Sequence, residues 1–179
     1  MYKNEQGFTL AELLIVITIL GAAASVAVPD ISTTNVSRLE LAATEIADAM
    51  RFARSESMSQ SSPRAFNQQS SIQRIRVFRP DTAASPWNPI YDVYHPLSKQ
   101  LYDIDLEDHS FASADSINRS TDYRGTCNTP GQVYFDLNGT PWCTNPETIL
   151  LDQYVVTLTA GKHTRTVTLH SITGRVTVQ

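Results

Sequence analysis

Residues Gly7 to Pro29 read GFTLAELLIVITILGAAASVAVP, and this stretch decides how the chain is organised. Between Phe8 and Val28 the only ionisable side chain is Glu12. The run has about the 20 apolar residues that a helix needs to cross the hydrocarbon core of a bilayer. It therefore predicts a membrane-spanning helix.

Glu12 is the unusual residue of this run. A carboxylate near the middle of a spanning helix costs on the order of 3 kcal/mol, so it is expected to have a function and a partner. The nearest candidate partner is the amino group of Phe8, which exists only if the chain is cleaved after Gly7.

The pattern resembles the processing and assembly motif of type IV pilins and type II secretion pseudopilins. Counted from Phe8, Glu12 is the fifth residue and Pro29 the twenty-second, as in that family. The resemblance implies that a prepilin peptidase cuts between Gly7 and Phe8 and N-methylates Phe8. It also implies that Glu12 pairs with the Phe8 amine of a neighbouring subunit during filament assembly. The physics agrees, because a buried carboxylate and a buried ammonium offset each other's desolvation cost.

Two other interpretations of the N-terminal run are a secretory signal peptide and a plain single-pass anchor. A signal peptide has a basic start, an apolar centre of about 7 to 15 residues and a small-residue cleavage site. Residues 25–27, Ser-Val-Ala, would serve as that site. Against it, Lys3 is balanced by Glu5, the run contains an acid, and the run is too long.

The remainder of the 179-residue chain has the size of one soluble domain. A formal net charge of -4 excludes a strongly basic protein, so net charge gives no argument for nucleic acid. The two cysteines, Cys127 and Cys143, would face the oxidising side of the membrane. We expect a disulfide that closes a loop of about 17 residues and contributes roughly 3 kcal/mol. No His or acid partners at short spacing favour a metal site or a nucleophile there.

After Pro29 the sequence predicts a second, amphipathic half of the same helix, from Asp30 to about Ser57. Proline interrupts the hydrogen-bond ladder and should bend the helix. A Ser-rich segment before Pro63 marks its end. Apolar residues recur at helical spacing at Leu39, Ala42 or Ala43, Ile46, Ala49 or Met50, and Ala53. The predicted organisation is a leader (1–7), a transmembrane and assembly half-helix (8–29), an amphipathic half-helix (30–62) and a β-rich head (63–179).

Three short motifs add a narrower resemblance, to the GspH/FimT group of minor pilins and pseudopilins. They are A-R-S-E at the end of the helix, with Ser57 in place of the usual Ala, F-D-x-x-G at Phe135 to Gly139, and T-G-R-V at Thr173 to Val176. The resemblance implies an α+β fold in which two antiparallel sheets pack beside the long helix.

Alternation and turn residues predict the strands of the head. A strand over Ile72–Phe78 is ended by Pro80, and a strand over Gln132–Leu137 is ended by Asn138-Gly139. We also expect a hairpin of residues 90–95 and 100–106, a loop over 108–128, and an antiparallel meander of residues 149–159, 164–169 and 175–178.

No sequence motif indicates an enzyme, a metal or a cofactor. G-x-S-x-G, H-E-x-x-H and Gly-rich phosphate loops are absent, and His95, His109, His163 and His170 lack ligand spacing. The densest acidic cluster, over residues 103–108, is expected to be a solvated edge. Calcium is a less favoured alternative, because the EF-hand spacing is missing.

After Asp152 the chain has no acid, and Lys162, Arg165 and Arg175 are candidates for a basic patch that contacts DNA phosphates. Some FimT-like minor pilins bind DNA through a G-R-x-R segment. Here the second Arg is missing after Gly174-Arg175, and three positive charges supply little affinity at physiological salt.

The sequence therefore predicts a non-enzymatic minor pilin or pseudopilin near the tip of a filament. It would be a single-pass protein of the bacterial inner membrane, with a cytoplasmic N-terminus and a periplasmic head. Its expected partners are prepilin peptidase, other subunits and the inner-membrane assembly machinery. The alternatives are a DNA-binding minor pilin of a competence pilus and the major fibre subunit. The sequence does not choose among secretion, attachment and DNA uptake.

Overall fold

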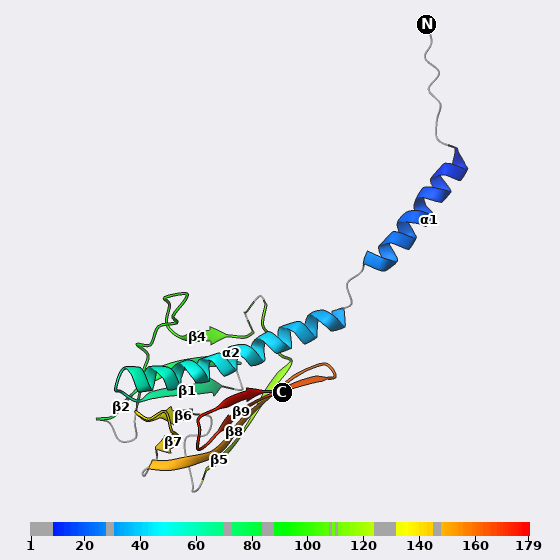
Figure 1. The fold of residues 1–179 in the computed structure, drawn as a ribbon. Helices are drawn as coiled ribbons and strands as arrows, with labels where there is room; N and C mark the ends of the chain where they lie inside the picture. Colours follow the sequence, from blue (N-terminus) through cyan, green and yellow to red (C-terminus); the bar gives the residue numbers. More distant parts are fainter. Residues whose placement is uncertain are drawn as a thin grey trace. The chain divides into compact units, whose positions relative to one another are not determined.

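The computed structural model describes residues 9–27, 31–69, 73–83, 88–107, 109, 111–123, 132–144 and 148–179. The chain divides into two compact units, Met1–Thr34 and Asn35–Gln179, and each is described by itself. Figure 1 labels the helices and most of the strands in chain order. The predicted site residues Gly7, Phe8, Pro29 and Cys127 lie outside the described residues.

The first unit contains α1, which runs from Leu10 to Ala27. Every residue from Leu10 to Ala23 is exposed, including all the large apolar side chains of the segment. In the part of the chain that the structure describes, no helix is both long enough and apolar enough to cross a membrane.

The helix α2, Ile31–Ser59, confirms the predicted amphipathic half-helix. The apolar residues predicted at helical spacing form a stripe along one face of α2, and this stripe is completely buried. The other faces carry exposed residues such as Arg38 and Glu40. Most of the stripe is alanine, which leaves room for the strands to approach the helix closely. The buried residues are Leu39, Ala42, Ala43, Ile46, Ala49, Met50 and Ala53.

Among the described residues of the head, ten strands follow α2, and their pairings are antiparallel. The long strand β8 pairs with β7 at its start and with β5 and β9 over the rest of its length, so two sheets share one strand. The strands are β1 (Arg64–Gln69), β2 (Arg74–Asp81), β3 (Asn88–Ile90), β4 (Asp103–Asp105), β5 (Ser116–Tyr123), β6 (Gln132–Phe135), β7 (Pro141–Thr144), β8 (Thr148–Ala160), β9 (His163–His170) and β10 (Val176–Val178).

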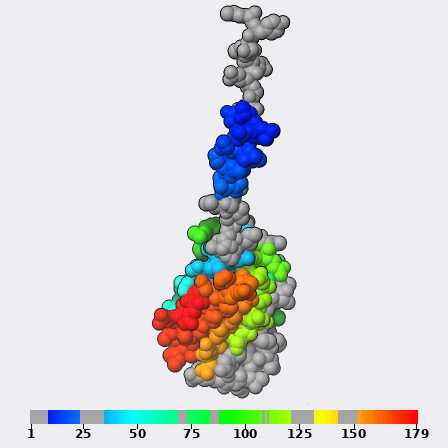
Figure 2. All heavy atoms as spheres, turned by 90° about the vertical axis from the view of Figure 1, so that its right-hand side faces the viewer, coloured from blue at the N-terminus to red at the C-terminus, as the bar shows by residue number. Residues whose placement is uncertain are grey.

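The α+β prediction, with a helix packed on two antiparallel sheets, is confirmed. The strand order is β10-β9-β8-β7-β6-β1-β2-β3, with β4 on β2 and β5 on β8. In Figure 1, α2 lies along one side of this assembly. The strands β5, β8 and β9 lie side by side on one face, coloured from yellow-green to red in Figure 2.

The main core lies between α2 and the sheets. Alternation along the strands sends Phe66, Val133 and Phe135 into the cluster that contains the buried stripe of α2. The intervening residues make a smaller cluster of Ala65, Phe78, Tyr134 and Trp142. The strands β1, β2 and β6 therefore carry buried apolar residues on both faces.

The segment 88–107 covers part of α2. The predicted hairpin is present as a single bridge between Tyr94 and Leu101, while the following β4 pairs with β2. Tyr102 is buried and stacks on Phe52 of α2, with 5.1 Å between ring centroids. Burial, together with the charges of Glu45 and Asp48, raises the pKa of the Tyr102 hydroxyl.

Two expectations about the strands are wrong, and other strands have no predicted counterpart. The predicted loop over 108–128 contains β5, whose polar residues are held in a strand by pairing with β8. Pro80 does not end its strand: β2 continues to Asp81, and Pro80 lies opposite Pro89 of the short edge strand β3. A proline is tolerated there because an edge pairing does not require every N–H group. The strands β1 and β7 have no counterpart among the predicted elements.

Candidate functional site

Thr9 and Glu12 form a reciprocal capping box at the start of α1. The backbone N–H and the hydroxyl of Thr9 each donate to Glu12 Oε2 at 2.9 Å, and the Glu12 N–H donates to Thr9 Oγ1 at 3.3 Å. Two donors at the helix start are thereby satisfied, and the carboxylate lies at the positive end of the helix dipole.

The capping box places Glu12 at the start of a helix and gives its carboxylate a local partner. The sequence suggests an acid near the middle of a helix, whereas α1 begins at Leu10, so Glu12 lies in its first turn. Thr9 is a site residue that was not predicted, although T-x-x-E before an apolar run is a known signature of a helix start. Since Phe8 is outside the described residues, its pairing with Glu12 stays a prediction.

Other predicted site residues also stay untested. The cleavage site at Gly7 and Phe8 and the bend at Pro29 are not described. Cys143 lies on β7, where its backbone is paired in register with Ile149, but Cys127 lies outside the described residues. The disulfide therefore remains a prediction.

The three cations of the predicted basic patch are not brought together. Lys162 is in the turn between β8 and β9, and Arg165 follows near the start of β9. Arg175 lies just before β10, beside the opposite end of β9, because Val176 pairs with Leu169. At about 3.4 Å per residue, Arg165 and Arg175 are about 17 Å apart along the strand.

DNA binding stays a prediction, tested by a gel shift with the head and its Lys162→Ala, Arg165→Ala and Arg175→Ala variants. If these side chains contact DNA phosphates, the head should bind DNA at low salt, and added salt and each substitution should weaken the binding. Absence of binding at low salt would remove the hypothesis.

The three family-like motifs of the head converge on Arg54. Its Nε donates to the carbonyl oxygen of Gly139 at 3.1 Å. Gly139 and Gly174 both have positive φ, at 74° and 59°. A Cβ on Gly174 would lie 2.5 Å from Arg54 Nε, and one on Gly139 would lie 2.9 Å from it. The A-R-S-E helix end, the F-D-x-x-G turn and the T-G-R-V turn therefore form one packed unit, which we call the motif junction.

Ser57 adds a hydrogen bond to the motif junction. This residue is completely buried. Its hydroxyl lies 2.8 Å from the carbonyl oxygen of Phe135 and 2.7 Å from that of Asp136. The hydroxyl thus ties α2 to the end of β6.

We expect Ser57→Ala to lower the unfolding free energy of the head by about 1 kcal/mol, because a buried hydrogen bond is lost. Urea denaturation followed by tryptophan fluorescence measures the change. Ser59→Ala is the control, since Ser59 is exposed and its hydroxyl bonds only to Glu56 of its own helix. Equal stability of the wild type and Ser57→Ala would show that the bond contributes nothing.

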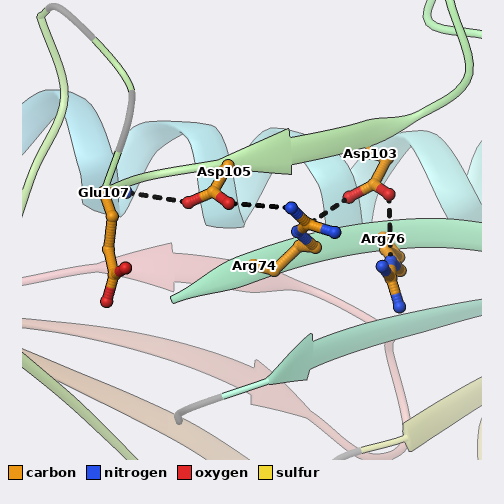
Figure 3. A network of polar contacts seen from close by, with 5 residues as sticks. All are labelled: Arg74, Arg76, Asp103, Asp105 and Glu107. Carbon is orange, nitrogen blue, oxygen red and sulfur yellow. Dashed lines mark hydrogen bonds and ion pairs between the residues drawn. The ribbon is translucent and has the colours of Figure 1, made fainter. Parts of the chain in front are cut away.

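The acidic cluster of residues 103–108 is engaged by arginines of β2. Figure 3 shows Arg74 between Asp103 and Asp105, and Arg76 beside Asp103. The shortest pair, Arg74 Nη2 to Asp105 Oδ2, is 2.9 Å long. Among the described residues, which exclude Asp108, no group of three or more His, Cys, Asp and Glu side chains is arranged to hold a metal ion. These pairs join β4 to β2.

Asp103→Asn should lower the unfolding free energy by about 1 kcal/mol or less. The paired groups are about one-third exposed, and water weakens the attraction between charges that it reaches. The difference should shrink at about 1 M NaCl, where the Debye length is about 3 Å. Asp92→Asn, which breaks the exposed pair with Arg79, is the matched control. Calcium should leave the wild-type denaturation midpoint unchanged, and a rise of several degrees would instead support a calcium site.

Comparison with known proteins identifies an N-terminal motif and a similar fold. The family model described as the prokaryotic N-terminal methylation motif matches residues 2–28. The type IV minor pilin FimU of Pseudomonas aeruginosa strain PAO1 has a similar fold, with a TM-score of 0.51 and 18% identity over 82% of this chain and 92% of that chain.

A second solved structure, the minor pseudopilin EpsH from the Type 2 Secretion System of Vibrio cholerae, aligns with 8% identity and a TM-score of 0.49 over 79% of this chain and 96% of that chain. The search of curated protein sequences gave no match. At 18% identity the FimU structure shows a similar fold alone, and the N-terminal methylation motif is matched over residues 2–28.

Proposed function

We propose that this chain is a minor pilin or pseudopilin, a structural subunit that enters a type IV pilus or type II secretion pseudopilus near its tip. Prepilin peptidase cleaves it between Gly7 and Phe8 before assembly. The observation that carries the proposal is the surface of α1, which is apolar on every side and has one acid, Glu12, in its first turn.

Such a surface requires a non-aqueous environment. Leu10 is 81% exposed and Ile19 is 62% exposed, and large apolar side chains between them are exposed as well. A helix that is hydrophobic all round is found in a membrane or in the core of a large assembly. A pilin subunit meets both environments in turn, first in the inner membrane and then in the filament. A single-pass location, with the head in the periplasm, is part of the proposal.

The head supplies the second part of the subunit. Its core residues all belong to the unit Asn35–Gln179, so the head has a hydrophobic core without α1. A rigid head of this kind leaves its loops and edges free to contact other subunits. The proposed structural role requires no catalytic reaction of the head.

Filaments sheared from the native host test the proposal. We expect the chain in the sheared fraction at a small fraction of the amount of the major subunit, and its loss from that fraction in a strain without prepilin peptidase. Amounts equal to the major subunit would identify it as the fibre subunit instead. Absence from filaments of the peptidase-positive strain would contradict the proposal.

A further inference from the structure

A basic crevice lies in the head, between the second half of α2 and the turn that joins β9 to β10. It has a volume of about 640 Å³ and is lined by Arg51, Arg54 and Arg175, with Met58, Thr173 and Val176 among the other residues. No acidic residue is among the described residues that line it. The crevice borders the motif junction and is distinct from the Lys162 end of the head.

Arg54 lines the crevice, and its side chain is held in place. Its Nε is bonded to the Gly139 carbonyl, and its side chain lies where Cβ atoms on Gly139 and Gly174 would be. Among the described residues no carboxylate pairs with Arg54. A guanidinium held by its stem keeps its two terminal nitrogens for a ligand and loses little entropy when it binds an oxyanion in a bidentate manner.

The other two arginines add positive charge. Arg51 pairs with Asp48 at 2.7 Å and donates to the carbonyl oxygen of Val176 at 3.3 Å, so its charge is partly compensated. Arg175 is exposed, and within the described part of the chain no acid pairs with it. The crevice therefore carries more positive than negative charge, although the whole chain has a net charge of -4.

We propose that this crevice binds a carboxylate side chain on an acidic segment of a neighbouring filament subunit. The proposal rests on the function proposed above, because that function supplies the neighbour. A water molecule occupies about 30 Å³ of liquid, so the crevice has room for a peptide segment and not just for an ion. Arg and Met are enriched at protein interfaces, and Met58 is 49% exposed here.

The surroundings favour a peptide over nucleic acid. Asp152 lines the adjoining pocket together with Arg175, and Asp48 lies beside Arg51. Proteins that bind a nucleic-acid strand do so with a continuous basic groove that runs along the phosphate backbone. The acids interrupt such a path, and Lys162 and Arg165 lie toward the far end of β9.

Amide NMR of the full chain in detergent tests the proposal without a filament. The probes are an acetyl-Ala-Glu-Leu amide, the same peptide with Gln in place of Glu, inorganic phosphate and a 12-nucleotide single strand. We expect the Glu peptide to shift the amides of Gly174 and Arg175, and Arg175→Gln to weaken its binding by about tenfold, as expected for one charge-assisted contact.

Arg38→Gln is the matched control. It removes the same charge from an exposed position of α2, about 20 Å from Arg51 along the helix, and should leave binding unchanged. Equal binding of the Gln peptide, or an equal loss in Arg38→Gln, would overturn the proposal. Shifts produced by the single strand and not by the Glu peptide would overturn it in favour of nucleic acid. Because the assay needs no assembly, these outcomes are independent of whether the chain enters filaments.

Discussion

Glu12→Ala should reduce the amount of this chain in sheared filaments by more than about tenfold, while its head remains folded. Removing one member of a buried ion pair costs about 3 to 5 kcal/mol, because the other charge stays buried without compensation. In the proposed filament that other charge is the Phe8 amine. Quantitative immunoblotting of the sheared and cell-associated fractions measures the loss.

The capping box at Thr9 and Glu12 requires a control, since Ala removes both a charge and a helix cap. Glutamine also serves in a capping box, so Glu12→Gln removes the charge and keeps the cap. Thr9→Ala does the reverse. Charge pairing predicts that Glu12→Gln fails to enter filaments and that Thr9→Ala enters them. The opposite pattern would show that Glu12 acts as a helix cap and not as a partner of Phe8.

Gly174→Ala should lower the unfolding free energy of the head by about 3 kcal/mol. The backbone of Gly174 has φ of 59°, which costs a residue with a Cβ about 1 to 2 kcal/mol. The new Cβ would also lie 2.5 Å from Arg54 Nε and 2.8 Å from the carbonyl oxygen of Gly139. Overpacking of this kind adds about 1 to 3 kcal/mol. Urea denaturation of residues 35–179, which contain the core, measures the change.

Gly161→Ala separates the two contributions. Gly161 has the same φ of 59°, but a Cβ there would meet nothing within 4 Å. We expect this variant to lose only about 1 to 2 kcal/mol, which is the backbone cost alone. Adding Arg54→Ala to Gly174→Ala should relieve only part of the strain, because the Gly139 carbonyl remains in place. Equal losses in the two glycine variants would show that the motif junction is not tightly packed.

The sequence predicts elements well where one residue pattern suffices. The buried stripe of α2 can be predicted from helical spacing because each of its apolar residues faces the same core. The β8–β9–β10 meander can be predicted from alternating apolar residues and from glycines at the turns. In residues 116–120 of β5, whose burial the structure describes, Ile117 is the only apolar residue, so alternation gives no signal and the strand depends on its partner β8.

The site is less predictable because its contacts are long-range. The sequence contains all three motifs of the motif junction, but nothing in it indicates that Arg54 meets Gly139, which is 85 residues away. Likewise, Arg165 and Arg175 are close in sequence, yet the antiparallel strands place them toward opposite ends of β9. Thr9, by contrast, could have been found from the T-x-x-E signature.

The mass of the N-terminal peptide of the chain recovered from filaments distinguishes pilin processing from other cleavage. We predict a peptide that begins with N-methylated Phe8, whose amine is the proposed partner of Glu12. A peptide that begins at Val28 or Asp30 would show cleavage as a secretory signal and would refute processing as a pilin.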